Sequence, residues 1–458
     1  MRLPVALLLS LIPALLALQP ARAQVPGAFV TIPAADQPVH GSGVSATMPP
    51  DDQIMWTRPP TSSSSGGVGW SFLLLADVNG DGLDDLCGLY GLSNGQHVYG
   101  CVHNNAAGFF EGPIAQAQAF NGPPTPSVHS TMALVDLDGT GPASLCGRTM
   151  EGMKCQRFNP ATGTFDPPFA LFPNDPQVDF SDANFWNTEP YHSTIAFTRI
   201  AGKTALCGRR STGVICFLRN HGAFVAKAFW QPAFNDSGNW NLPQYYRTLR
   251  YVDVDGDGSA DICLRGEAGV WCSFWRQVPV SRFDTPILMT SQFSDYYGWN
   301  NARYFGSIRI GDVSADGLPE ICGRGGGGLY CGIDRSQAGL AHPLAGDEFK
   351  LVQTGMSDAQ NWGNPTARLD SLFIVDFDGD GKNDVCGLNA PSGSGFPDLF
   401  CAKSRSTATG AVFDALVVRT RNVNTADKIV AGHLYNGGAM GFCWRLLDGS
   451  VNCSARWR

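Results

Sequence analysis

The sequence predicts an all-β fold, a seven-bladed β-propeller built from four-stranded blades. The first observation is that the fourteen cysteines fall into seven neighbouring pairs, whose first members recur about every 59 residues, a period typical of a repeat architecture. The second is an Asp-rich loop before most pairs, and the third is a Gly-containing turn inside them. Seven units of four short strands indicate a propeller with one unit per blade.

Four strands account for each unit. Strand A is an apolar run that enters the Asp-rich loop, as in 372–375, and strands B and C carry the two cysteines on either side of a Gly turn, as in 265–271. Strand D follows and opens with a small residue and Phe in several copies, as in 222–225.

Each cysteine pair is expected to form a disulfide within its own hairpin, because directly opposed residues of strands B and C are close enough for one. Zinc is a weaker interpretation, because zinc-binding cysteines are usually two to four residues apart and histidine partners at metal spacing are missing. The expected disulfides are Cys87–Cys101, Cys146–Cys155, Cys207–Cys216, Cys263–Cys272, Cys322–Cys331, Cys386–Cys401 and Cys443–Cys453.

Four of the Asp-rich loops follow the pattern D-x-D-x-D-G-x-x-D or a close variant. Positions 1, 3, 5 and 9 offer side-chain oxygens, position 6 is glycine, and position 7 would offer a backbone carbonyl. This donor set indicates about four structural Ca²⁺ ions, and the alternative is a solvated Asp/Gly turn without metal. The expected ligands are Asp77, Asn79, Asp81, Leu83 and Asp85; Asp253, Asp255, Asp257, Ser259 and Asp261; Asp312, Ser314, Asp316, Leu318 and Glu320; and Asp376, Asp378, Asp380, Lys382 and Asp384.

The other three copies of the loop have lost acidic residues. The second copy keeps Asp136 and Asp138 but has Thr140 and Ser144, so a metal ion there is doubtful, and the third and seventh copies have no acids. This uneven loss favours local structural ions over one catalytic metal, which would need a single distinguished open site.

On these loops the chain resembles the FG-GAP and VCBS repeat families and the propellers of integrin α-chains. The residues that carry the resemblance are Asp253 to Asp261 and the copies at 77–85, 312–320 and 376–384. The resemblance implies calcium in a seven-bladed propeller and a tendency toward adhesion or recognition outside the cell. The chain departs from these families by pairing cysteines within every unit.

The N-terminal region predicts export and ring closure. Residues 1–23 read as a secretory signal peptide that ends in a small-x-small cleavage site, and no later stretch approaches a membrane span. Within residues 24–67 we expect 27–33 to form the missing strand D of the seventh blade and 59–67 to be a flexible linker. The propeller would then occupy residues 68–458, in a secreted or periplasmic protein with disulfides.

A second motif recurs between units, an Asp followed by a Trp four residues later. Aromatic faces and carboxylates can bind a sugar, and the neighbouring B–C turns would bring Arg148, Arg209, Arg265 and Arg324 to the same face. The alternative is packing, with Trp wedged between blades and Asp capping its own turn. The candidate ligand-binding residues are Asp182, Trp186, Asp236, Trp240, Asp295, Trp299, Asp358 and Trp362.

No catalytic motif emerges from the sequence, and the formal charge of −8 with no basic stripe argues against nucleic acid as a partner. The leading hypothesis is therefore a calcium- and disulfide-stabilised propeller that recognises carbohydrate or a cell-surface ligand without catalysis. A carbohydrate-active enzyme of the lyase or hydrolase type and a structural interaction scaffold remain the alternatives, because propellers host several functions.

Overall fold

The computed structural model describes the chain between residues 69 and 453. The stretches left out of this description are 92–96, 105–109, 121–124, 140, 174–179, 221, 278–279, 333–349, 364–371, 379, 390–396, 408–410, 421–424, 436–438 and 447–450. The predicted signal peptide, the predicted closing strand at 27–33 and the linker at 59–67 lie outside the described residues.

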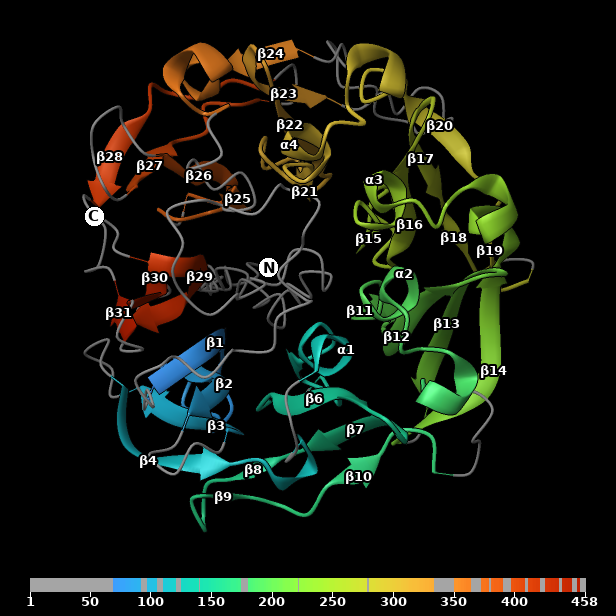
Figure 1. Ribbon diagram of the computed structural model, residues 1–458, viewed down its shortest axis with the longest axis vertical. Helices are drawn as coiled ribbons and strands as arrows, with labels where there is room; N and C mark the ends of the chain where they lie inside the picture. The colour runs from blue at the N-terminus through green and yellow to red at the C-terminus, as the bar shows by residue number, and fades with distance from the viewer. Residues whose placement is uncertain are drawn as a thin grey trace, which may run out of the picture.

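Six antiparallel sheets of four strands follow one another around a ring, as Figure 1 shows. Within each sheet strand A pairs with B, B with C and C with D. Blades one to three comprise β1 (Gly69–Ala76), β2 (Asp85–Gly91), β3 (His97–Asn104) and β4 (Phe110–Gln116); β5 (Ala133–Val135), β6 (Ser144–Thr149), β7 (Gly152–Gln156) and β10 (Phe169–Ala170); and β11 (Ala196–Ile200), β12 (Lys203–Arg210), β13 (Gly213–Asn220) and β14 (Ala223–Gln231). Blades four to six comprise β15 (Arg250–Val252), β16 (Asp261–Gly266), β17 (Gly269–Ser273) and β20 (Ile287–Thr290); β21 (Arg309–Gly311), β22 (Glu320–Gly325), β23 (Gly328–Gly332) and β24 (Lys350–Gln353); and β25 (Phe373–Val375), β26 (Asp384–Asn389), β27 (Asp398–Ala402) and β28 (Val417–Thr420).

Two blades carry an extra hairpin between strands C and D. Blade two inserts β8 (Phe158–Asn159) and β9 (Thr164–Phe165), and blade four inserts β18 (Trp275–Arg276) and β19 (Arg282–Phe283). These hairpins lengthen the C–D connection and bring basic residues back toward the Asp-rich loops.

A three-stranded sheet completes the ring between blade six and blade one. It consists of β29 (Thr425–Tyr435), β30 (Ala439–Leu446) and β31 (Val451–Cys453). Ile429 and Phe442 share a core with blade six, while Val430 and Leu434 share another with Leu73 of blade one. The prediction of four strands in every blade is thus confirmed for six sheets only, because the strand expected to complete the last sheet lies outside the described residues.

The hydrophobic cores lie between neighbouring blades. Successive residues of a strand point to opposite faces of its sheet, so each blade packs apolar side chains against both neighbours. Phe197 of blade three shares one core with Val135 of blade two, whereas Cys207 on the next strand of blade three shares another with Ile262 of blade four. Ring closure therefore depends on every interface between blades.

All seven predicted disulfides are present, and no described cysteine is free. In each hairpin the two cysteines are direct partners in the register of strands B and C, as Cys263 and Cys272 illustrate. Their Cα atoms are 4.1 Å apart, close to the spacing of opposed residues in an antiparallel pair. Seven such bonds indicate an oxidising compartment outside the cytoplasm.

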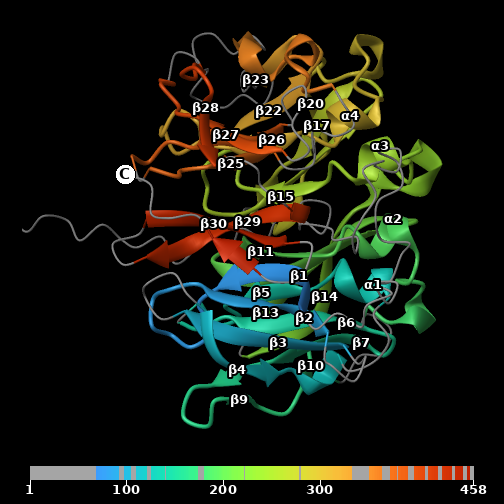
Figure 2. The ribbon, with the colours of Figure 1, turned by 60° about the vertical axis from the view of Figure 1, so that its left-hand side comes forward.

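Short helices lead into strand A of blades two to five, and Figure 2 shows them on one side of the ring. Each follows a loop that carries one or two turns of 3-10 helix. The helices are α1 (Pro126–His129), α2 (Glu189–His192), α3 (Pro243–Tyr246) and α4 (Ala302–Phe305). The 3-10 turns before them are η2 (Gln118–Phe120), η3 (Asp182–Asn184), η4 (Pro232–Phe234), η5 (Asp236–Gly238) and η6 (Asp295–Tyr297). The loop before blade six carries η8 (Thr354–Met356) and η9 (Asp358–Gln360). None of the helices in the described ranges is long and apolar enough to cross a membrane.

Candidate functional site

The carboxylate at position 1 accepts hydrogen bonds from the backbone of its own Asp-rich loop. In blade four, Asp253 accepts hydrogen bonds from the backbone N–H groups of Gly256 (2.8 Å), Asp257 (3.1 Å) and Gly258 (2.8 Å). Gly258 at position 6 has a φ of 83°, a conformation that a side chain would strain. The glycine predicted at this position is therefore required by the turn, whether or not a cation is bound.

The carboxylate at position 9 ties the loop to the end of strand C. Asp261 is buried and accepts the N–H groups of Val254 (2.9 Å) and Trp275 (2.8 Å). Burial raises the pKa of Asp261 well above its ordinary value, and burial likewise raises the pKa of Asp384 in blade six to about 7. Both carboxylates thus lie where a nearby cation would favour the charged form.

Two loops gather three carboxylates into a group that can hold a metal ion. Asp253, Asp255 and Asp261 each offer one oxygen, and these oxygens all lie within 4.8 Å of one another. The second group obeys the same limit and consists of Asp376, Asp378 and Asp384. Because all donors are oxygens, the sites suit a hard cation such as Ca²⁺.

An independent observation supports a cation at the blade-four group. The side chain of Asp255 is only 5% exposed. Its Oδ1 is buried and has no hydrogen-bond partner among the residues that the structure describes. A buried carboxylate oxygen without a partner is costly, and a metal ion held by the group would satisfy it. The residues present therefore fit the predicted ion.

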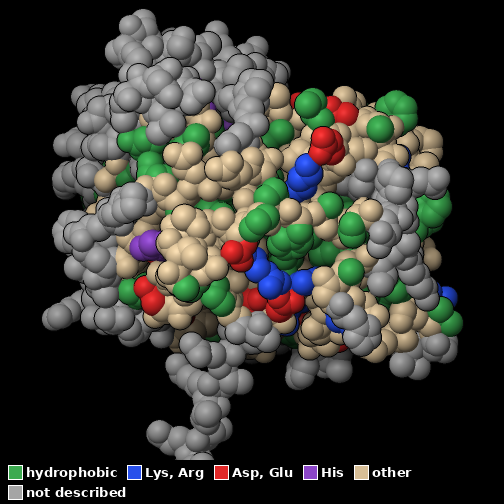
Figure 3. Space-filling model, turned by 90° about the horizontal axis from the view of Figure 1, so that it is seen from below, with side chains coloured by type: hydrophobic (Ala, Val, Ile, Leu, Met, Phe, Trp, Pro, Cys, Tyr) green, Lys and Arg blue, Asp and Glu red, His purple; other side chains and the backbone are tan. Residues whose placement is uncertain are grey.

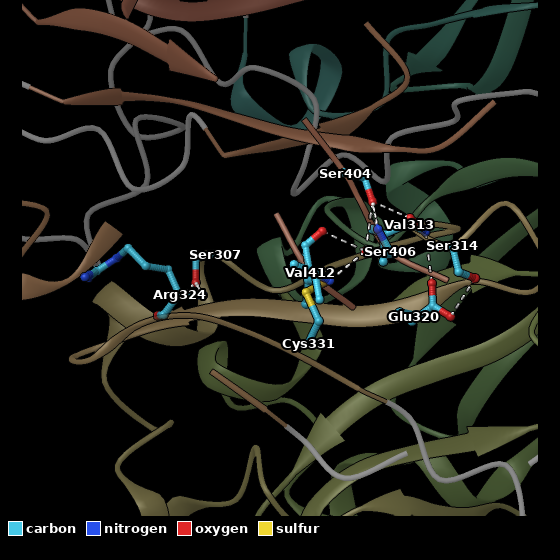
Figure 4. Close-up of a disulfide and its surroundings, with 10 residues drawn as sticks. Ser307, Val313, Ser314, Glu320, Arg324, Cys331, Ser404, Ser406 and Val412 are labelled. Atoms are coloured by element: carbon cyan, nitrogen blue, oxygen red, sulfur yellow. Dashed lines mark hydrogen bonds between the residues drawn. A yellow bond between two sulfur atoms is a disulfide. The ribbon is translucent and has the colours of Figure 1, made fainter. Parts of the chain in front are cut away.

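The loops of blades one and five differ at position 3, where Asn79 and Ser314 replace the aspartate. Neither loop therefore forms a group of three carboxylates in the described structure. In blade five, Glu320 accepts the N–H of Val313 (2.9 Å), whose carbonyl accepts the Ser404 hydroxyl of blade six (2.5 Å), as Figure 4 shows. This loop is used to join two blades.

Position 5 does not contribute to either carboxylate group. Asp257 and its equivalents are exposed, and each accepts the N–H of the residue at position 7. These pairs are Asp81–Leu83, Asp257–Ser259, Asp316–Leu318 and Asp380–Lys382. In blades four and six the predicted metal ligands therefore divide into a carboxylate group at positions 1, 3 and 9 and a separate turn contact between positions 5 and 7.

A second set of clusters joins the arginines of strand B to the loops between blades. The guanidinium of Arg265 is fully buried and pairs with Asp295, and it also donates to the carbonyls of Phe293 (2.6 Å) and Gln244 (3.2 Å). The equivalent pairs are Arg148–Asp182, Arg209–Asp236 and Arg324–Asp358. The expectation that these arginines and aspartates share one face is confirmed.

A tyrosine completes three of these four clusters. The hydroxyl of Tyr245 donates to the second oxygen of Asp295 (3.0 Å), and the ring lies 5.4 Å from the Arg265 guanidinium carbon. Burial, together with the Asp295 carboxylate, raises the pKa of Tyr245 to about 12. Tyr191–Asp236 (2.7 Å) and Tyr304–Asp358 (3.0 Å) repeat the contact. In these three clusters both carboxylate oxygens are already used within the protein.

The tryptophans of the same loops serve packing. Trp186, Trp299 and Trp362 are buried, and Trp240 is half-buried. The ring of Trp186 contacts Phe180 and lies over Gly208 of blade three, where an added Cβ would come within 2.8 Å of it. The faces of the three buried rings are therefore not open to a sugar, and the packing alternative describes them.

The cluster of blade two is the exception. The third residue of the preceding helix is Val128, whereas the other three helices have tyrosine there. Asp182 pairs with Arg148 through Oδ1, and no residue in the described ranges bonds its Oδ2. Its side chain is 36% exposed. Comparing the four helices position by position could have revealed this difference from the sequence.

Two residues with large, exposed apolar side chains lie close to Asp182 along the backbone. The backbone N–H of Asp182 donates to the carbonyl of Met150 (3.0 Å), and Phe185 ends the same 3-10 turn. Met150 is 74% exposed and Phe185 is 69% exposed. Contiguous exposed apolar side chains mark contact sites, whereas single ones are common on folded surfaces. Sequence reasoning had selected Asp182 but not Met150 or Phe185.

The histidines near strand A belong to the core. His192 is buried, and its Nδ1 lies 2.7 Å from the Ser130 hydroxyl. Burial and the charge of Arg148 lower the pKa of His192 to about 3, so the imidazole is neutral. His129 likewise bonds the hydroxyl of Tyr99 (3.0 Å). The interpretation of these two residues as hydrogen-bonded core histidines is supported.

Comparisons with known proteins were made at three levels. No family model and no curated protein matches the chain, so the likeness to FG-GAP and VCBS repeats rests on its loops alone. A solved structure of an Agrocybe aegerita lectin, described as recognising non-reducing terminal N-acetylglucosamine, is 20% identical with a TM-score of 0.61 and covers 84% of this chain and 85% of its own. At that identity the similarity shows the fold alone.

Two further solved structures align less well. The Tc holotoxin pore of Photorhabdus luminescens is 17% identical with a TM-score of 0.41, and the alignment covers 78% of this chain and 15% of that one. A TcdB2–TccC3 structure is 14% identical with a TM-score of 0.32 over 84% and 18% of the two chains. Fold and disulfides together define the chain as a β-propeller with a disulfide inside each of the seven sheets that form its ring.

Proposed function

We propose that the protein is a non-catalytic recognition module that binds carbohydrate through the propeller face that carries the loops between blades. The observation that carries this proposal is the open carboxylate of Asp182, in a turn that also holds the exposed Phe185 and bonds the backbone of the exposed Met150. The fold shared with a lectin that recognises terminal N-acetylglucosamine supports it further. The candidate site moves from the four tryptophans to the junction of blades two and three.

The chemistry at this junction favours an uncharged sugar. Arg148 already neutralises the charge of Asp182, so the carboxylate acts as a hydrogen-bond acceptor for hydroxyl groups. The exposed ring of Phe185 offers an apolar face for the C–H side of a pyranose. Arg210 lies nearby, because its guanidinium donates to the carbonyl of Asn184 (3.2 Å) and covers Trp186. It supplies further donors at the edge of the site.

A glycan array followed by calorimetry tests this proposal. Phe185→Ala should leave the melting temperature unchanged and weaken binding of the best array ligand at least about five-fold, since stacking contributes roughly 1 kcal/mol or more. Tyr296→Ala is the matched control, because Tyr296 is also exposed but lies in a loop whose Asp295 is fully bonded. An array without hits, or equal binding by Phe185→Ala, would refute the proposal.

We also propose that Ca²⁺ occupies the carboxylate groups of blades four and six. The oxygen-only donors and the partnerless Oδ1 of Asp255 support this assignment, and the ion would fix the A–B turn of each blade. Metal analysis of protein passed through calcium-containing buffer should find at least two ions per chain. Asp255→Asn should remove one of them, whereas Asp138→Asn should remove none. Protein without calcium would contradict the assignment.

We further propose that residues 1–23 are removed on export, that residues 24–67 hold the closing strand and linker, and that the propeller spans residues 68–458. The seven disulfides support an oxidising destination. The outer edge of β31 has no partner among the described strands, which leaves a place for residues 27–33. Sequencing of the exported protein should begin at Gln24, and a start at Met1 would contradict the processing.

A further inference from the structure

A basic side chain from the end of strand C or just beyond it reaches the Asp-rich loop in four blades. It is His103 in blade one, Arg157 in blade two, Arg276 in blade four and Lys403 in blade six. In every case its partner includes the residue at position 3. Position 3 is also one of the three positions that supply the carboxylate groups of blades four and six.

In blade two, guanidinium groups contact both oxygens of the aspartate at position 3. Asp138 pairs through one oxygen with Arg157 and through the other with Arg219 of blade three (2.6 Å). Both carboxylate oxygens are therefore occupied by guanidinium groups. Asp136 uses its oxygens for the backbone N–H groups of Asp138, Gly139 and Gly141. The four carboxylate oxygens of Asp136 and Asp138 are therefore all bonded within the protein.

In blade four, the aspartate at position 3 pairs with an arginine and also belongs to the carboxylate group that can hold an ion. Arg276 lies on the inserted hairpin and approaches Oδ2 of Asp255 at 2.5 Å, while Oδ1 of Asp255 remains without a partner. Its Nε also donates to Asp284 at 3.0 Å. Arg276 thus neutralises part of the loop charge when no ion is bound. Asp284 holds the guanidinium in position beside the carboxylate group of Asp253, Asp255 and Asp261.

Blade six repeats the contact between a basic side chain and position 3, although Oδ1 of Asp378 accepts the N–H of Asp380 (3.2 Å), and blade one varies the contact. Lys403 approaches Oδ2 of Asp378 at 2.5 Å. In blade one position 3 is the neutral Asn79, and the basic residue there is His103, at 3.4 Å. Full positive charge therefore accompanies a carboxylate at position 3, and a weaker base accompanies an amide. Figure 3 shows Lys and Arg interspersed with Asp and Glu on the face it presents.

We infer that Arg276 and Lys403 are built-in competitors that set the calcium affinity of blades four and six. The inference rests on the calcium sites proposed above. Each cation stabilises the empty loop by neutralising position 3 and repels an ion bound at the remaining oxygens. A charge of +1 at about 6 Å from a divalent ion weakens binding about ten-fold even in the dielectric of water. These sites would accordingly bind calcium weakly and exchange it readily.

Calorimetric titration of chelated full-length protein with CaCl₂ tests the inference. Arg276→Gln should tighten one site about ten-fold, Lys403→Gln should tighten another, and both chelated variants should melt below wild type. Arg282→Gln is the matched control, since Arg282 also contacts Asp284 (3.5 Å) but is mostly exposed and bonds no loop residue. It should change neither property.

Two results would overturn the inference, and they are distinguishable. If wild type binds calcium and Arg276→Gln binds it equally or more weakly, the arginine only orients Asp255 and the calcium proposal stands. If wild type and both variants bind no calcium, the inference fails together with the calcium proposal. The carbohydrate proposal does not depend on either outcome.

Discussion

The buried arginines of strand B make a quantitative prediction about what holds neighbouring blades together. In Arg265→Met the new side chain has a similar length but cannot hydrogen-bond. The substitution removes the ion pair with Asp295 and leaves the carbonyls of Phe293 and Gln244 without their donors. It also removes the cation that lies over the ring of Tyr245. The contact between strand B and two inter-blade loops would therefore be lost at once.

The expected cost follows from burial. Removing one partner of a buried ion pair costs about 3–5 kcal/mol, and a partly exposed partner brings the value toward the lower end. Asp295 is only a quarter exposed, so we expect the free energy of unfolding to fall by about 3–4 kcal/mol. With an unfolding entropy of about 2.1 cal/mol/K per residue over roughly 390 residues, this corresponds to a decrease of about 4–5 °C in the melting temperature.

Differential scanning calorimetry of wild type and Arg265→Met in the same calcium-containing buffer measures this shift. Arg282→Met is the control, because its side chain is 65% exposed and its ion pair with Asp284 is long. Exposed pairs contribute little, so its melting temperature should stay within about 1 °C of wild type. If Arg265→Met melted as late as Arg282→Met, the reasoning about the buried cluster would be refuted.

Three further predictions concern packing, calcium and ring closure. Gly208→Ala should cost about 1–3 kcal/mol by overpacking against Trp186, and an unchanged melting temperature would contradict that packing. Chelation should lower the melting temperature reversibly. The folded-state pKa of Asp384 is about 7, above the usual value of about 3.9, so the chelated protein should regain stability as the pH falls from 8 to 5. A gain of equal size with calcium bound would contradict the assignment of this pH dependence to Asp384. Deletion of residues 24–35 should lower the melting temperature sharply if 27–33 closes the ring, and an unchanged melt would rule out that role.

Much of the fold follows from contacts that are close in sequence. Cys263 and Cys272 are nine residues apart around a Gly turn, so hairpin geometry alone places their Cα atoms together. Asp253 and Gly258 belong to one turn, so spacing predicts both the glycine and the oxygens around it. Repetition of such local units then indicates a propeller, because each blade needs neighbours on both faces to bury its strands.

The contacts of the loops between blades do not follow from the sequence pattern. The spacing from Asp to Trp is the same in all four loops, yet Trp186 is buried against Gly208 and only the cluster of Asp182 keeps an open oxygen. The partner of Asp236 is Tyr191, 45 residues earlier, on the helix that enters the same blade. No sequence pattern links two loops at such a distance without knowledge of how the blade returns.

The sequence by itself determined the repeat, the seven disulfides and the acidic loops, because hairpins and turns are fixed by residues a few positions apart. The tertiary structure decided which oxygens converge, which tryptophans are buried and which carboxylate stays open. It also decided that Arg276 lies beside Asp255, since the inserted hairpin turns the chain back onto the loop. These features depend on packing between sheets and around the ring, where partners come from distant parts of the chain.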